Sequence, residues 1–229
     1  MLSRADVINH FIGAFQYERY LEIGVQAGVT FNAVQCINKV AVDPCFGVEL
    51  KDIQGTPYAM TSDAYFDEHP DARFDIVFID GLHTLDQSLR DFTRSLLRIP
   101  RTGLILIDDA FPSDYLAADR SLEFCNGIKT AENWPDRNWM GDVFKTALFI
   151  NEFFDQLSLC YIADTLGIVA VWYEPRRVAP IFGDTAVEGI ARCEFSRFKY
   201  EAAPRIPKMS VVDVTDSLRR ARAPEGNQI

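Results

Sequence analysis

Short runs rich in β-branched and aromatic residues alternate along this chain with segments of helical periodicity. The clearest run is Phe74 to Asp80, which is nearly continuous in Ile, Val and Phe, as a strand buried on both faces should be. The next segment, Leu85 to Arg98, places Leu and Phe at offsets of 0, 4, 7 and 11, which is one face of a helix. Such alternation predicts a mostly parallel sheet covered by helices.

Extended over the whole chain, the pattern predicts an α/β fold with one Rossmann-like, doubly wound sheet of seven strands, mostly parallel, with an antiparallel last strand. The closing hairpin is expected from 157–163 and 167–173. Residues 110–140 form a long aromatic connection of the kind that covers a substrate. We therefore expect the main domain over 1–175, with a helical or irregular extension over 176–229 packed on it. The other strands are expected at 20–25, 39–43, 57–61 and 104–108, and the other helices at 4–18, 30–38, 62–66 and 141–154.

Length and composition exclude several classes of protein. A chain of 229 residues suits one α/β domain with a substantial core, and its net charge of −10 disfavours nucleic acids and anionic membranes as partners. Five cysteines without a C-x-x-C pair argue against a disulfide framework or a zinc knuckle. The N-terminus lacks the pattern of a signal peptide, and no apolar run is long enough to span a membrane, so we expect a cytoplasmic protein.

The charge is distributed unevenly along the chain. Residues 176–229 contain 10 Lys or Arg and 7 Asp or Glu, although the whole chain is acidic. An extension of this sign can pack against the acidic body, which is the interpretation we favour, or it can help to form a homodimer.

A glycine-containing turn follows the first predicted strand. In Leu21 to Gly28 a strand ends, Gly24 and Gly28 allow a tight turn, and a helix begins, so ligand atoms can lie against bare backbone. Asp43 ends the second predicted strand, where an acidic side chain can accept hydrogen bonds from ribose hydroxyls. These features predict a nucleoside site, but the spacing is G-x-x-x-G and not the G-x-G-x-x-G of a dinucleotide site.

The turn resembles the first motif of class I methyltransferases that use S-adenosylmethionine (SAM), with acidic Glu22 inside the strand and Gln26 in place of the family's middle glycine. Phe74 to Thr84 resembles the fourth-strand motif of a bacterial subgroup, with its Asp-Gly-x-His turn. Gly103 to Asp109 and Gly141 to Lys145 resemble two further elements of that subgroup. The likeness spans roughly residues 17–175 in the order of the motifs.

This resemblance implies O-methylation of a small-molecule acceptor, such as a hydroxyl of a sugar or a secondary metabolite, with SAM as cofactor. Ser62 and Asp63 would face the adenine, although Ser62 can equally cap a helix. The implied cofactor-binding residues are Glu22, Gly24, Gly28, Asp43, Ser62, Asp63 and Asp80.

Three carboxylates follow two strands that are neighbours in this fold. Asp80, Asp108 and Asp109 should converge at the carboxyl edge of the sheet, where they repel one another unless a cation intervenes. Mg²⁺ or another divalent cation prefers such oxygen ligands, and the pattern resembles that of metal-dependent O-methyltransferases. The alternative is that these acids are solvated residues at strand ends.

His83 lies three residues after Asp80. Its ordinary pKa of about 6.5 suits removal of a hydroxyl proton near neutral pH, so His83 and Asp80 are the predicted catalytic residues. A histidine at this place can also be structural.

Two other functions remain open at this point. An NAD(P)-dependent oxidoreductase or epimerase shares the first strand, its turn and the ribose acid. A non-catalytic SAM-binding or dimerisation module is allowed by Gln26 and by the basic extension.

Overall fold

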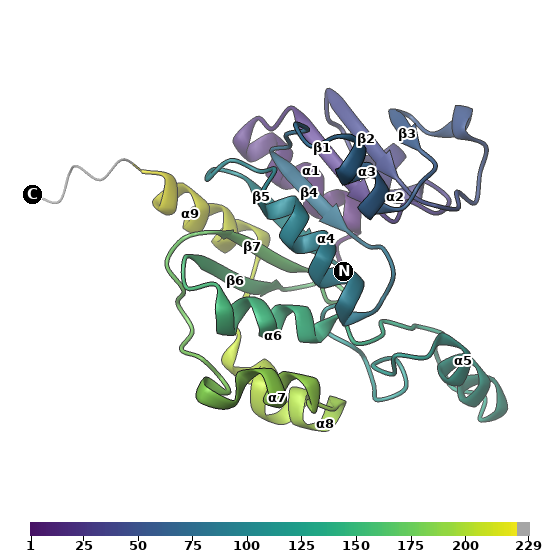
Figure 1. Ribbon diagram of the computed structural model, residues 1–229, viewed down its shortest axis with the longest axis vertical. Helices are drawn as coiled ribbons and strands as arrows, with labels where there is room; N and C mark the ends of the chain where they lie inside the picture. Colours follow the sequence, from purple (N-terminus) through teal and green to yellow (C-terminus); the bar gives the residue numbers. More distant parts are fainter. Residues whose placement is uncertain (224–229) are drawn as a thin grey trace, which may run out of the picture.

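The structure, a computed structural model, describes residues 1–223, so residues 224–229 of the predicted extension lie outside it. Its centre is a sheet in the order β3-β2-β1-β4-β5-β7-β6-β8, with helices on both faces (Figure 1). The α/β prediction is confirmed.

The strands are β1 (Arg19–Ile23), β2 (Asn38–Val42), β3 (Thr56–Tyr58), β4 (Ile76–Ile79), β5 (Leu104–Ile107), β6 (Leu157–Ile162), β7 (Val169–Tyr173) and β8 (Lys208–Met209). The helices are α1 (Arg4–Phe15), α2 (Val29–Ala33), α3 (Ser62–Glu68), α4 (Leu85–Leu96), α5 (Leu122–Ala131), α6 (Phe144–Phe153), α7 (Ala186–Ala191), α8 (Phe195–Arg197) and α9 (Val211–Arg222).

The order of the strands reverses at β1. This strand pairs in parallel with β2 on one side and with β4 on the other, so a crevice opens at their carboxyl ends. β7 is antiparallel to both β5 and β6, as expected for the closing hairpin. It is not the last strand, because the C-terminal extension adds the short β8 in parallel beside β6.

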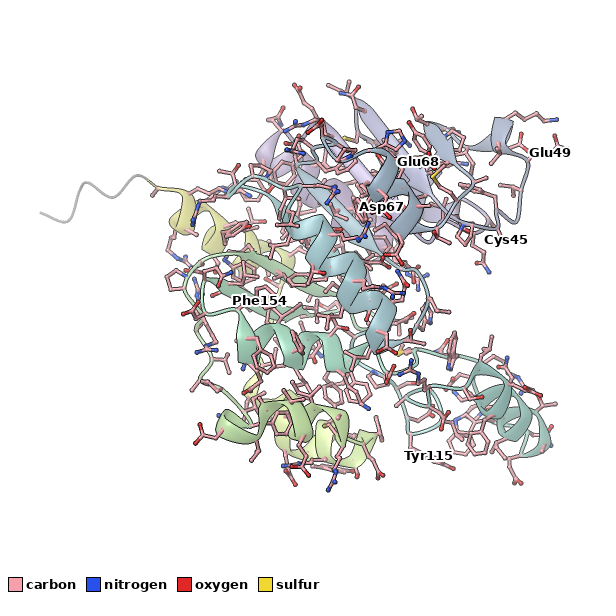
Figure 2. All side chains as sticks on the ribbon, viewed as in Figure 1. Cys45, Glu49, Asp67, Glu68, Tyr115 and Phe154 are labelled. Carbon is pink, nitrogen blue, oxygen red and sulfur yellow. The ribbon has the colours of Figure 1, made fainter. Side chains whose placement is uncertain are left out.

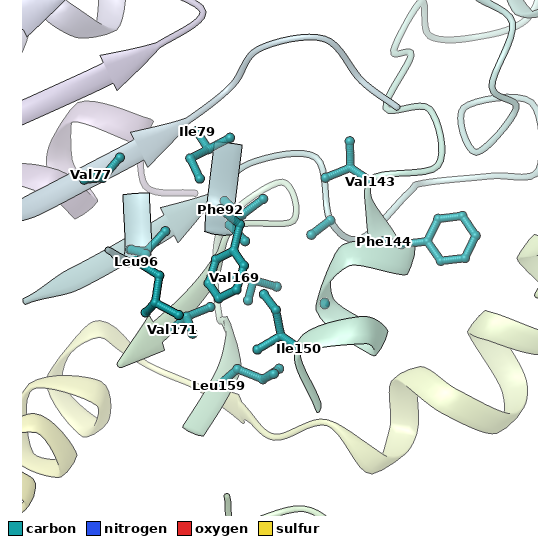
Figure 3. Close-up of a cluster of buried hydrophobic side chains, with 14 of the residues drawn as sticks. Val77, Ile79, Phe92, Leu96, Val143, Phe144, Ile150, Leu159, Val169 and Val171 are labelled. Carbon is teal, nitrogen blue, oxygen red and sulfur yellow. The ribbon is translucent and has the colours of Figure 1, made fainter. Parts of the chain in front are cut away.

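Strand residues alternate between two hydrophobic clusters. Val77 and Ile79 of β4 face the cluster covered by α3, α4 and α6, part of which is drawn in Figure 3. Ile76 and Phe78 face the opposite cluster, covered by α1, α2 and α9. Burial of both faces explains why these strands read as continuous apolar runs.

Two predicted segments differ from the structure. The helix expected over 30–38 ends at Ala33. Lys39 Nζ donates to the carbonyl oxygens of Phe31 and Val34 at 2.8 and 2.9 Å, which gives these carbonyls at the helix end the hydrogen bonds that the helix does not supply. The connection 110–140 contains α5, which projects away from the sheet; Tyr115 lies on the same projection (Figure 2).

The extension packs on the rest of the chain. α7 lies against α6, and α9 lies against α1 and the β6–β7 hairpin. The Glu152 carboxylate accepts backbone N–H groups from Phe182 and Gly183, both at 3.2 Å, and joins α6 to the extension. The boundary at residue 175, the homodimer and the cytoplasmic location stay predictions. Within residues 1–223, none of the helices has the length and apolarity that a membrane crossing requires.

The contact between α3 and α4 holds a buried carboxylate. Thr61, and not Ser62, caps α3, since its side chain accepts from Ala64 N–H at 3.2 Å. The Ser62 hydroxyl donates instead to Asp91 Oδ1, which also accepts from Gln87 Nε2 at 2.9 Å. Burial raises the pKa of Asp91 to about 6, although these two hydrogen bonds work against the shift.

This buried acid should make stability depend on pH. Because the pKa of Asp91 is higher in the folded chain, its contribution to folding is largest below about pH 4 and is lost as the pH rises through about 6. Asp91→Asn keeps an acceptor without a charge. We compare the free energy of unfolding of this variant with that of the unsubstituted protein, measured by urea denaturation at about pH 4 and about pH 7. The difference should shift in favour of the variant at the higher pH, by up to about 3 kcal/mol.

Asp86→Asn on the same helix is the matched control. Arg120 donates to the exposed Asp86 carboxylate and lowers its pKa, so this substitution should change stability with pH in the opposite direction. An Asp91→Asn effect that is the same at both pH values would contradict the assignment.

Candidate active site

The turn after β1 touches the end of β4. Gly24 has φ +84°, and a Cβ there would lie 1.9 Å from the Asp80 carbonyl oxygen, so only glycine fits. Gly28 also has a positive φ, of +73°. Gln26, which stands where the family motif has a glycine, adopts φ +48°, a conformation that glycine takes with less strain.

Asp43 organises this turn. Its Oδ2 accepts the backbone N–H groups of Val25 and Gln26, both at 2.8 Å, and its Oδ1 accepts that of Cys45 at 2.7 Å. A carboxylate offers about four acceptor positions, so roughly one, on Oδ1, is left for a ligand.

Glu22 lies behind the turn and is only 2% exposed. The Tyr20 hydroxyl donates to its Oε2, and burial raises the pKa of Glu22 to about 8. At neutral pH this side chain is therefore mainly neutral.

The acids expected to converge do so, and two basic side chains lie between them. Arg4 of α1 donates through Nε to Asp108 Oδ2, and one of its Nη atoms lies 3.8 Å from Asp80 Oδ2. His83 Nε2 lies 3.4 Å from Asp80 Oδ1 and 3.1 Å from Asp109 Oδ2. Acidic and basic side chains alternate in the order Asp108, Arg4, Asp80, His83, Asp109, which we call the charged row.

The backbone explains why the two adjacent acids point apart. Asp109 has φ +56°, so the chain turns sharply immediately after Asp108. Burial, followed by repulsion from Asp80, raises the pKa of Asp108 to about 6. Burial, followed by repulsion from Asp108, raises the pKa of Asp109 to about 7.

His83 is held from its other side by the segment before α6. Its Nδ1 lies 3.0 Å from the Trp139 carbonyl oxygen, and the two rings stack with centroids 4.9 Å apart. A carbonyl only accepts, so Nδ1 carries the proton and Nε2 faces the acids. Burial disfavours a charged ring, but the hydrogen bond to Asp80 and the charge of Asp109 outweigh it and raise the pKa of His83.

The Gly141 to Lys145 element supports this arrangement. Gly141 has φ +58°, and a Cβ there would lie 1.8 Å from the His83 carbonyl oxygen. Asp142 Oδ1 accepts the Leu85 N–H at 2.7 Å and so caps α4 from a distance. The Gly141 to Lys145 element thus fixes the segment that carries His83.

The structure brings some of the predicted site residues together and not others. Ser62 and Asp63 both face α4, where Asp63 lies 3.4 Å from Arg90 and 3.6 Å from Arg94. Of the three acids predicted to hold a metal, Asp108 is paired with Arg4. The side chains that do converge with a geometry able to hold a metal are Asp80, His83 and Asp109.

Sequence reasoning missed Arg4, which lies 104 residues from Asp108 along the chain and belongs to no motif. It also gave Asp142 no role, although the Gly141 to Lys145 element was a signal for one. A cavity of about 340 Å³ lies beside Arg4 and Asp108, between residues 2–5, the start of α2 and the β6–β7 turn.

Comparison with known proteins agrees with this geometry. Residues 21–110 match a family described as a methyltransferase domain, and no curated protein matches the sequence. Among solved structures, a methyltransferase of Podospora anserina bound to S-adenosylhomocysteine (SAH) shares 14% identity, with a TM-score of 0.52 over 76% of this chain and 80% of that chain. An O-methyltransferase of Bacillus cereus in complex with SAH shares 12%, with a TM-score of 0.50 over 76% and 83%. A protein of Staphylococcus aureus described as a caffeoyl-CoA O-methyltransferase shares 14%, with a TM-score of 0.51 over 76% and 85%.

The matched residues include the β1 turn, Asp43 and all three acids of the charged row, whereas Arg4 lies outside them. The nicotinamide-dependent alternative is not favoured by the match. Residues 21–110 thus match a methyltransferase domain, and the fold of the chain around them is similar to that of SAM-dependent methyltransferases of class I.

Proposed function

We propose that this methyltransferase transfers the methyl group to a hydroxyl of a small molecule, such as a sugar or a secondary metabolite. The observation that carries the proposal is the placement of His83 Nε2 between two carboxylates, 3.1 Å from Asp109 and 3.4 Å from Asp80. A hydroxyl acceptor needs a group that removes its proton, and this arrangement supplies one. The names of the O-methyltransferases with a similar fold agree with the proposal.

SAM supplies a methyl group that its positive sulfonium already activates for transfer. Gly24, Gly28 and Asp43 would hold the cofactor, with Glu22 behind them. In support, two apolar side chains flank the turn without cover from the chain: Val29 is 80% exposed and Leu82 is 59% exposed. Such side chains suit contact with a nucleoside.

The remaining task of the chain is to position the acceptor and to remove a proton. The acceptor hydroxyl donates its hydrogen bond to His83 Nε2, which takes the proton, and the Asp80 carboxylate beside the ring stabilises the positive charge that the ring then carries. The Trp139 carbonyl fixes the ring, and the indole shields one face of it from water. Because the neighbouring acids raise the pKa of His83, the ring becomes available as a base only above its ordinary pKa of about 6.5.

Cofactor binding can be measured without knowing the acceptor. Isothermal titration calorimetry should show that the protein binds SAH. Asp43→Ala should weaken this binding by at least about tenfold, because the turn loses the hydrogen bonds that hold it and the ribose loses a hydrogen-bond acceptor. Glu49→Ala, at an exposed position, is the control and should bind normally. Folded protein that gives no heat with SAH, or that binds NAD instead, would overturn the function.

Proton removal can be tested through His83. With an acceptor found by screening hydroxylated small molecules for SAH release, His83→Ala should lower kcat by about 10² to 10⁴ while SAH affinity stays unchanged. The rate of the unsubstituted enzyme should rise with pH through the raised pKa of His83, and this rise should disappear in the variant. His10→Ala, which changes a histidine bonded to Thr215, should retain both kcat and the pH profile. Equal kcat in His83→Ala would reject the base.

A further inference from the structure

The position of Arg4 is fixed by local structure at the start of the chain. Ser3 caps α1 in a capping box with Asp6: the Ser3 side chain accepts the Asp6 N–H at 3.1 Å, and Asp6 Oδ2 accepts the Ser3 N–H at 3.0 Å. The Leu2 N–H donates to the Asp164 carbonyl oxygen at 2.8 Å and ties the segment to the β6–β7 turn. Arg4, the first residue of α1, is therefore held at the edge of the sheet.

Its guanidinium occupies the space between two acids that the sequence assigned to a metal. Arg4 Nε donates to Asp108 Oδ2, an Nη atom lies 3.8 Å from Asp80 Oδ2, and the Asp108 side chain is only 2% exposed. The remaining set of possible metal ligands, with His83 and Asp109, shares Asp80 with Arg4. A divalent cation in either place would therefore face a fixed positive charge at close range.

We infer that Arg4 takes the place of a divalent cation in this methyltransferase, so that the acids at the sheet edge are neutralised by the chain itself and methyl transfer requires no bound metal. The catalytic part of this inference rests on the proposed function. The part that concerns cation binding rests on the contacts of Arg4 alone.

The location of Arg4 also gives it access to the acceptor. A guanidinium has five N–H donors and never loses its charge in proteins, and here only part of it is used by Asp108 and Asp80. Arg4 and Asp108 both line the cavity of about 340 Å³, and the Arg4 side chain is 45% exposed. The unused donors can orient an acceptor oxygen, which is the positioning role of a metal in a metal-dependent site.

The inference is tested by titrating the protein with Mn²⁺ and measuring the free ion by electron paramagnetic resonance. The unsubstituted protein should not bind Mn²⁺ specifically. Arg4→Met should bind it more than about tenfold more tightly, a change of about 1.4 kcal/mol, and Arg4→Lys should stay as poor a binder as the unsubstituted protein. Adding Asp108→Asn to Arg4→Met should remove the gained site.

Arg19→Met is the matched control. Arg19 is also 45% exposed and pairs with an acid, Asp75, at 2.5 Å, but it lies at the opposite end of β1. This variant should gain no Mn²⁺ site. SAH titration and circular dichroism establish that each variant is folded, independently of the metal measurement.

Two results would overturn the inference. In the first, the unsubstituted protein binds Mn²⁺ as tightly as Arg4→Met does, and chelation of the metal abolishes its SAH binding or its methyl transfer. The other is a folded Arg4→Met protein that binds no more Mn²⁺ than the Arg19→Met control. A failure of SAH to bind to any variant would instead reject the proposed function and leave the Mn²⁺ comparison to decide the role of Arg4.

Discussion

The contact between the β1 turn and the end of β4 fixes the geometry on which the rest of the site depends. A Cβ at Gly24 would lie 1.9 Å from the Asp80 carbonyl oxygen, so the absence of a side chain lets two central strands end at one point. Asp43 holds the turn from the far side through the N–H groups of Val25 and Gln26. One packing constraint therefore sets the positions of the β1 turn and of Asp80, an acid of the charged row.

Electrostatics then decides what this edge of the sheet can bind. Buried charges are tolerated when each has a partner, and the charged row meets that condition by alternating acids with Arg4 and His83. Burial is the first cause that keeps the pKa values of Asp108 and Asp109 raised, to about 6 and about 7, in spite of these partners.

The sequence predicted the fold well because burial on both sheet faces leaves a strong apolar signal in strands such as 74–80. It predicted the convergence of three acids because parallel strands end at the same edge. It did not predict how those acids are paired. Arg4 is far away in sequence, and its contact with Asp108 depends on how α1 packs on the sheet, which no local pattern records. The hydrogen-bond partner of Ser62 was also not predicted, because a hydroxyl near a helix start can cap the helix or reach a buried partner such as Asp91.

The route of the first residues has a practical consequence for work with this protein. Leu2 and Ser3 line the cavity beside Asp108, and Met1 is 86% exposed. Any residues fused before Met1, such as an affinity tag, would leave the molecule at the mouth of this cavity. They would also begin next to the hydrogen bond that Leu2 N–H donates to the Asp164 carbonyl oxygen. Recombinant protein with a fusion at this end would therefore carry a foreign peptide close to Arg4 and Asp108.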